Sequence, residues 1–112
     1  MKLEEVARKL DGEMLNKAGT FEQAVVGGVV VSDLMSDVLV VDHEHQFLVT
    51  SLATDQAVRT AHLIDASALI ICNGKVVSES MQRIAKQTGV TLMSSPEAKF
   101  EVSVKIGKIL GL

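Results

Sequence analysis

The polar residues that could do chemistry gather at two places where an apolar run ends. One is Ser32–Asp37, which follows the β-branched run Val25–Val31, and the other is Thr50–Gln56, which closes the run beginning at Phe47. Hydroxyl, carboxylate and amide groups at the start of a helix can bind an anion, a ribose or an amide, because the first backbone N–H groups of the helix have no partner within it. The same groups can serve only to cap the helix. Both interpretations are open for both segments.

A glycine pair, Gly27-Gly28, lies within the first of these apolar runs. It would let the backbone approach a ligand closely, although a bulge or tight turn would need glycine equally. The Gly-Lys-Ser/Thr sequence of a Walker A loop is missing, which argues against ATP hydrolysis. The residues that we expect to bind a ligand are Gly27, Gly28, Ser32, Asp33, Thr50, Ser51, Thr54, Asp55 and Gln56.

Neither the histidines nor the single cysteine forms a recognisable catalytic or metal-binding pattern. His43 and His45 lie two residues apart beside carboxylates, but a third ligand at a matching spacing is missing, so a solvated loop is expected. His62 suits a polar helix face. Cys72 ends the apolar run Ala68–Cys72 and is expected to fill the core. The sequence therefore predicts no catalytic residue, no metal and no cofactor.

The composition is that of a small domain with an aliphatic core. The chain has 112 residues, of which 47% are hydrophobic and 3% aromatic. This length suits one domain spanning residues 1–112. No stretch is apolar enough to span a membrane and the charged N-terminal segment lacks the apolar centre of a secretory signal, so we expect a cytoplasmic protein. The net charge is −3 with acids and bases interspersed, which disfavours nucleic-acid binding.

Helical and strand patterns alternate along the chain. Helices are expected at Leu3–Leu10, after a cap at Ser32, from Thr54 to Ile64, from a cap at Ser78 or Ser80 to Gly89, and from Ser95-Pro96-Glu97 to the C-terminus. Strands are expected at Met14-Leu15, Val25–Val31, Phe47–Thr50, Ala68–Cys72 and Val90–Met93, with a turn at Asn73-Gly74. The continuous apolar character of Val25–Val31 predicts an interior strand.

This alternation predicts an α/β three-layer sandwich, with a largely parallel or mixed sheet of about five strands flanked by helices. In such sheets ligands bind beyond the carboxyl ends of the strands, where loops turn into helices. Both polar segments fit that position.

Several segments, in this order, resemble the DRTGG-domain family: Gly27-Gly28, Ser32–Val38, Leu48–Thr50, Ala68–Ile71 with Gly74, and Gly89–Leu92. The resemblance covers essentially the whole chain and implies the fold of the N-terminal domain of HPr kinase/phosphorylase. Members occur within some phosphotransacetylases and between the CBS domains of some pyrophosphatases, where they accompany a catalytic module. The chain departs from the family's Asp-Arg-x-Thr-Gly-Gly motif, because only Gly27 and Gly28 of it remain.

The resemblance implies a non-catalytic regulatory or interaction domain, homodimeric, that modulates a partner enzyme or kinase. The alternative is a sensor of an adenine nucleotide or another small metabolite. A small enzyme is disfavoured, because the sequence offers no nucleophile–base pair or metal set. The apolar stripe Ala98, Val102, Ile106 and Ile109 on the C-terminal helix also favours a symmetric dimer.

Overall fold

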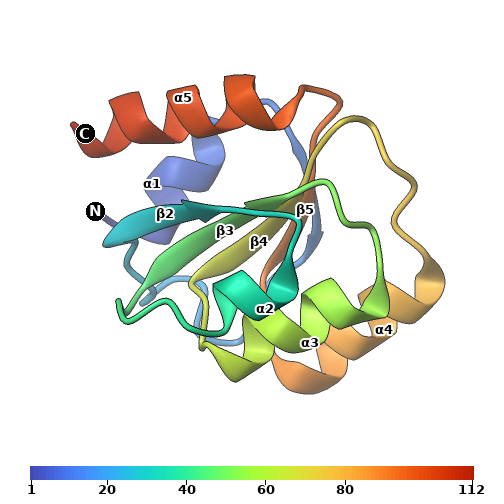
Figure 1. Cartoon of the computed structure of the whole chain (residues 1–112). Coiled ribbons are helices and arrows are strands. Elements are labelled where there is room, and N and C mark those ends of the chain that lie inside the picture. Colours follow the sequence, from blue (N-terminus) through green and yellow to red (C-terminus); the bar gives the residue numbers. More distant parts are fainter.

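Helices and strands alternate through the whole molecule, as Figure 1 shows. The computed structural model describes residues 1–112. The strands are β1 (Glu13–Asn16), β2 (Gly28–Val31), β3 (Gln46–Thr50), β4 (Ala68–Ile71) and β5 (Leu92–Ser94). The helices are α1 (Leu3–Arg8), α2 (Met35–Val38), α3 (Asp55–Leu63), α4 (Glu79–Thr88) and α5 (Lys99–Leu110). None of them is both long and apolar enough to cross a membrane.

The strands form one mixed sheet in the order β1-β5-β4-β3-β2. Strands β2 to β5 are parallel, and β1 pairs antiparallel with β5. The register places Val31 opposite Val49, and Thr50 opposite Ile71. The carboxyl ends of the four parallel strands therefore meet at one edge of the sheet, which we call the carboxyl edge, and their amino ends meet at the opposite one, the amino edge.

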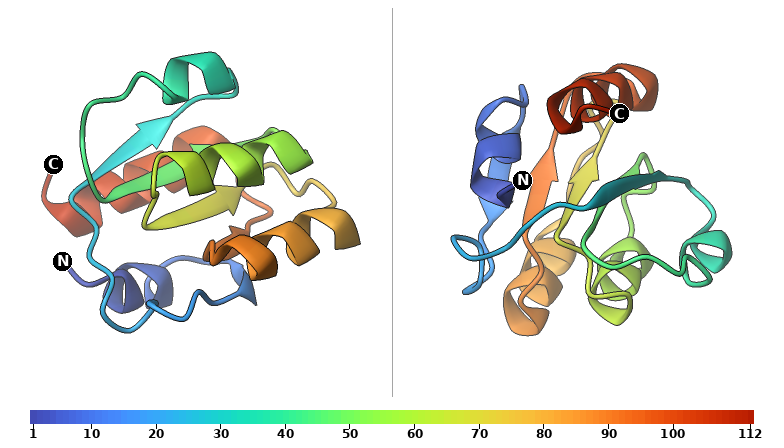
Figure 2. Two further views of the ribbon diagram at one scale, coloured as in Figure 1. Left: turned by 90° about the horizontal axis from the view of Figure 1, so that it is seen from below. Right: turned by 90° about the vertical axis from the view of Figure 1, so that its left-hand side faces the viewer.

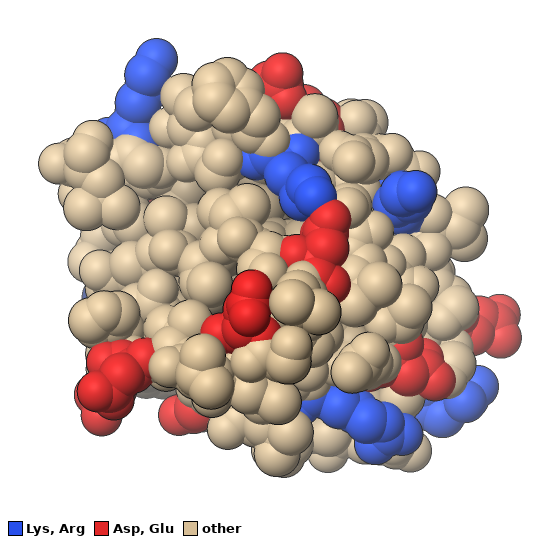
Figure 3. Space-filling model, in the orientation of Figure 1, with Lys and Arg blue, Asp and Glu red and all other residues tan.

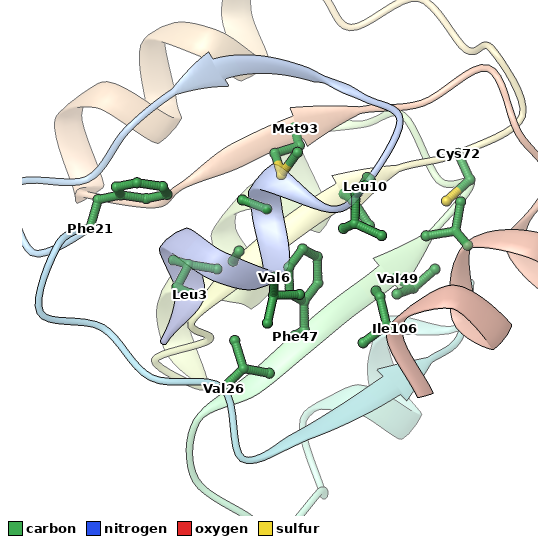
Figure 4. Close-up of a cluster of buried hydrophobic side chains, with 14 residues drawn as sticks. Leu3, Val6, Leu10, Phe21, Val26, Phe47, Val49, Cys72, Met93 and Ile106 are labelled. Atoms are coloured by element: carbon green, nitrogen blue, oxygen red, sulfur yellow. The ribbon is translucent and has the colours of Figure 1, made fainter. Parts of the chain in front are cut away.

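Helices cover both faces of the sheet and make three layers. The end-on view in Figure 2 shows α1 and α5 on one face and α2, α3 and α4 on the other. Successive strand residues point to opposite faces, so Phe47 and Val49 pack beneath α1 and α5 while Leu48 packs beneath the other helices. Figure 4 shows Phe47 and Val49 among the buried side chains beneath α1 and α5, near Val6 of α1 and Ile106 of α5. The α/β sandwich expected from the sequence is confirmed.

The helix caps agree with the sequence at α3 and α4. The Thr54 side chain accepts a hydrogen bond from the Ala57 N–H, and Ser78, rather than Ser80, caps α4 by accepting from the Met81 N–H. Gly89 ends α4 with a positive φ of 75°, a conformation that glycine adopts at little cost.

The expected caps of α2 and α5 are wrong. Ser32 accepts from the Leu34 N–H in a local turn, and α2 begins only at Met35. Likewise the Ser95 hydroxyl accepts from the Glu97 N–H, and α5 begins at Lys99. In both places the serine side chain closes a turn of its own, which competes with helix formation at that residue.

Strand β2 is shorter than expected and lies at the edge of the sheet, so the prediction of an interior strand is wrong. It begins at Gly28, while Val25 makes an isolated bridge with Lys2. Its apolar residues pack in part against both cores, Val29 against the core beneath α1 and α5 and Val30 against the core on the other face. Val31 at its end is 43% exposed. A uniformly apolar strand can therefore lie at the edge of a sheet.

Candidate functional site

The Asp33 carboxylate is the centre of the polar residues at the carboxyl edge. Its Oδ1 accepts hydrogen bonds from the Thr50 hydroxyl at 2.8 Å and from the Ser51 backbone N–H at 2.8 Å. Its Oδ2 accepts from the Ser51 hydroxyl at 3.0 Å and from the Lys99 ammonium group. We call Asp33, Thr50, Ser51 and Lys99 the Asp33 cluster. Four donors from two parts of the chain, Thr50-Ser51 and Lys99, thus converge on one carboxylate.

These contacts set the ionisation of Asp33. Partial burial raises the pKa of the carboxyl group, but the hydrogen bonds from Lys99, the Ser51 N–H and the two hydroxyls oppose it and win. The pKa of Asp33 therefore lies well below its usual range. The carboxylate stays charged at any physiological pH, and its lone pairs are occupied, so it is poorly suited to accept a proton from a substrate.

The sheet register explains how the Asp33 cluster forms. Ser32 donates its N–H to the Val49 carbonyl at 3.1 Å, which holds the chain beyond β2 against the end of β3. Asp33 then lies beside Thr50, a buried residue. Lys99, in the first turn of α5, reaches Asp33 from the face of the sheet that α1 and α5 cover.

Lys99 is the functional candidate that sequence reasoning missed. It lies 66 residues from Asp33 in the chain, and the only local signal was a basic residue in the first turn of a helix, where the dipole favours acids. That unfavourable placement is a sign that a basic residue has a distant partner.

In the rest of the corner Thr50–Gln56, some side chains make hydrogen bonds within the fold and one is left exposed. Thr54 caps α3, and the Asp55 carboxylate accepts a hydrogen bond of 2.8 Å from the Ser80 hydroxyl of α4. Gln56 is exposed in the first turn of α3. The structure therefore leaves Gln56 as the side chain of this corner with no structural assignment.

The glycine pair lies at the other end of β2. Gly28 begins the strand opposite Gln46, and a Cβ added to Gly28 would come 2.8 Å from the Gln46 side-chain nitrogen. A side chain at Gly28 would therefore require the end of the flexible Gln46 side chain to move. The residues expected to bind a ligand therefore form two groups at opposite ends of β2, with Gly27 and Gly28 apart from the seven others.

The surface depressions lie away from the Asp33 cluster. Two of them, of about 280 and 510 Å³, border the amino edge and share Thr20, Asp65, Ala66 and Gly89. A third, of about 440 Å³, includes Gly27 and Gly28. None of the five is lined by residues 32–37 or 50–56. The corner that the sequence singles out therefore has no depression, and a ligand could contact its polar groups only at the molecular surface.

The remaining nucleophilic and basic groups do not form a reactive set. Cys72 is fully buried, and this burial raises the pKa of its thiol to about 11. His45 is exposed and lies 3.7 Å from the carboxylate of its neighbour Glu44. Lys105 bridges Glu97 at 2.7 Å and Asp11 at 3.0 Å, and these hydrogen bonds raise the pKa of its ammonium group. Each such group therefore serves packing or a surface ion pair.

Comparison with known proteins identifies a family model that matches most of the chain and a solved structure with a similar fold. The model of the DRTGG domain matches residues 5–109. No curated protein sequence matches the chain well enough to be counted as a relative. The crystal structure of the CBS and DRTGG domains of the regulatory region of Clostridium perfringens pyrophosphatase, complexed with its activator diadenosine tetraphosphate, has a similar fold, with a TM-score of 0.71 and 18% sequence identity. The similarity covers 94% of this chain and 45% of that one, so this chain corresponds to less than half of that regulatory region.

Proposed function

Because the chain belongs to the DRTGG-domain family, we propose that it is a non-catalytic regulatory domain that forms a homodimer and modulates a partner enzyme or kinase. The observation that carries this proposal is the Asp33 cluster. Its carboxylate is already bonded to Thr50, Ser51 and Lys99. An acid or base for catalysis needs a free lone pair or proton at the reacting atom, and Asp33 offers neither.

The same cluster provides a route for regulation. It joins the ends of β2 and β3 to the first turn of α5 through Lys99. A partner or ligand that competes for the Lys99 ammonium group would weaken this link. The first turn of α5 would then be held less tightly against the ends of β2 and β3. Binding at the carboxyl edge would thus be coupled to the position of α5, which requires only that the two states differ in their affinity for the ligand.

A second candidate function is a sensor of an adenine nucleotide or another small metabolite. It is favoured by the similar pyrophosphatase regulatory region, whose structure contains diadenosine tetraphosphate. In this chain Gln56 and Ser51 lie beside the start of α3, where backbone N–H groups are available to a polar ligand. Asp55 would repel a highly charged phosphate, so a ribose or an amide suits this corner better.

The first test of the proposal is the mass of the purified chain in solution. Light scattering at micromolar concentration is expected to give twice the 12.0 kDa of one chain. A monomer at every concentration would contradict the homodimer.

A thermal-shift titration with AMP, ATP and diadenosine tetraphosphate then separates the two candidate functions. Regulation through protein contacts alone predicts an unchanged melting temperature. A sensor predicts a rise that Gln56→Ala or Ser51→Ala reduces, whereas Gln56→Ala leaves the melting temperature without ligand unchanged. The variant Arg83→Ala, on the exposed side of α4, is the matched control.

A further inference from the structure

The outer face of α5 is uncovered. The helix lies on the outside of its layer in Figures 1 and 2. Val102 and Ile106 on its inner side are buried, whereas Phe100 is 73% and Val104 37% exposed on the opposite side. Two apolar side chains at i and i+4 are neighbours on the helix surface and give it a short apolar strip suited to packing against a partner.

We propose that this face of α5 packs against the same face of a second copy of the chain, with the two helices antiparallel and the two-fold axis passing at Val104. The inference rests on the homodimer proposed above and names its surface. A two-fold interface must be self-complementary, so that each contact occurs twice. The residues around Val104 meet this requirement.

Helix geometry places four residues symmetrically around Val104. At 100° and about 1.5 Å per residue, Phe100 and Gly107 lie on one flank of Val104, at opposite ends of the helix. Glu101 and Lys108 lie on the other flank, again at opposite ends. A two-fold axis perpendicular to the helix brings equal flanks together in reverse order. Phe100 of each copy therefore meets Gly107 of the other, and Glu101 meets Lys108.

The first of these pairs combines a projecting ring with a notch. A Cβ added to Gly107 would find no atom within 4 Å, so packing within the chain does not require glycine there. Glycine inside a helix is unfavourable by itself. Its missing side chain leaves room on the outer surface for the Phe100 ring of a second copy.

The second pair is complementary in charge. Lys99 and Lys105 of the same helix are engaged with acidic residues of their own chain, whereas Glu101 and Lys108 are exposed and make no such ion pair. Figure 3 shows uncharged surface over α5 between a basic group towards its C-terminal end and an acidic group towards its N-terminal end. Antiparallel packing matches these opposite charges, while parallel packing would set like charges together.

The contact is small. A helix of 12 residues is about 18 Å long, so two such helices bury an area at the low end of specific interfaces. We therefore expect a dimer that dissociates on dilution below the micromolar range.

Sedimentation equilibrium across a range of concentrations tests the proposal. Val104→Arg places two like charges at the axis and is expected to abolish the dimer. Gly107→Leu fills the notch without a clash inside the chain and is expected to weaken the dimer at least tenfold. The matched control is Leu63→Arg, at an exposed position on α3, which should leave dimerisation unchanged. Circular dichroism of each variant checks that the fold is retained.

Charge exchange makes the test specific for the antiparallel arrangement. Glu101→Lys and Lys108→Glu are each expected to weaken the dimer several-fold, and the double variant to restore it. Val104→Cys should form a disulfide between two copies much faster than Leu63→Cys does, while the buried Cys72 remains reduced.

The possible failures are distinct. A stable dimer that is indifferent to Val104→Arg, Gly107→Leu and the charge exchange would overturn the assignment to α5 and leave the proposed homodimer standing. A monomer at all concentrations would overturn both. If the α5 face bound only a different protein and never a second copy, the proposed occupant of this face would be wrong.

Discussion

The two edges of the sheet use their polar residues in different ways. At the carboxyl edge, side chains from distant elements bond to one another, as in the Asp33 cluster and in the pair Asp55–Ser80. At the amino edge, side chains bond to backbone, as Ser67 does to the Val25 carbonyl and Gln46 to the Glu44 carbonyl. The larger depressions lie at this second edge.

Polar residues at the usual binding position of a parallel sheet can be fully engaged in hydrogen bonds within the fold. Hydroxyl and carboxylate groups gather at that edge because loops turn into helices there, whether or not the site binds a ligand. What differs is whether their hydrogen bonds are left for a ligand. In this chain the Asp33 cluster satisfies its own members, which is the expected property of a structural link between β2, β3 and α5.

The largest expected difference between the edges concerns glycine. A Cβ at Gly12, beside the carboxyl edge, would come 2.8 Å from the Ser94 carbonyl oxygen, whereas at Gly27, on the amino edge, the nearest atom would be 3.4 Å away. Gly12→Ala should therefore lower the free energy of unfolding by about 1–3 kcal/mol, the usual range for overpacking. Gly27→Ala should change it by less than about 0.5 kcal/mol. Urea unfolding of both variants measures the contrast, and equal effects would contradict it.

A second contrast compares the charged groups of the two edges. Asp33→Asn should cost about 1–2 kcal/mol at pH 7, towards the lower part of the range for charged hydrogen bonds because the Asp33 side chain is 40% exposed. Glu44→Gln, at the exposed pair with His45, should cost almost nothing. Both values come from urea unfolding.

The Asp33 contribution also has a defined pH dependence. The pKa of Asp33 is lower in the folded chain than its usual value of about 3.9. The stabilisation is thus fully present above that value, and it is lost as the pH falls towards the lower pKa of the folded state. The difference between the wild type and Asp33→Asn should shrink below about pH 4. A difference that is constant from pH 7 to pH 2 would show that the carboxylate charge is not its cause.

A smaller effect is expected at the helix caps of the carboxyl edge. Thr54 accepts from the Ala57 N–H at 3.4 Å and Ser78 accepts from the Met81 N–H at 3.1 Å. Within the usual range of about 0.5–2 kcal/mol for such caps, Thr54→Ala should cost less than Ser78→Ala. Gln56→Ala removes no cap and serves as the control. Thermal unfolding of the three variants would contradict this order if Gln56→Ala proved the most damaging.

The sequence was sufficient for what depends on neighbouring residues. The helical spacing before Gly89, the caps at Thr54 and Ser78 and the turn at Asn73-Gly74 all appear in the structure, because each is decided within about four residues. The α/β sandwich followed from the alternation of these local patterns.

Most of the failures depend on contacts that are distant in sequence, whereas the cap expected at Ser32 fails for a local reason, since the Ser32 hydroxyl accepts from the Leu34 N–H two residues on. Uniform apolarity predicted that β2 is an interior strand, but it carried no sign that one edge of β2 is open. The serine at position 95 looked like a helix cap because its bond to the Asp11 carbonyl, 84 residues away, leaves no local trace. For the same reason Asp33 was recognised as a candidate and its partner Lys99 was not.

A turnover assay on the purified chain tests directly whether the Asp33 cluster is a structural link. Because the acid, the hydroxyls and the lysine of the Asp33 cluster are bonded to one another, we predict no hydrolysis of ATP or of an acyl phosphate above that of a heat-treated control. Hydrolysis that persists through purification and is abolished by both Asp33→Asn and Lys99→Ala would contradict the claim that this cluster is a structural link rather than a reactive site.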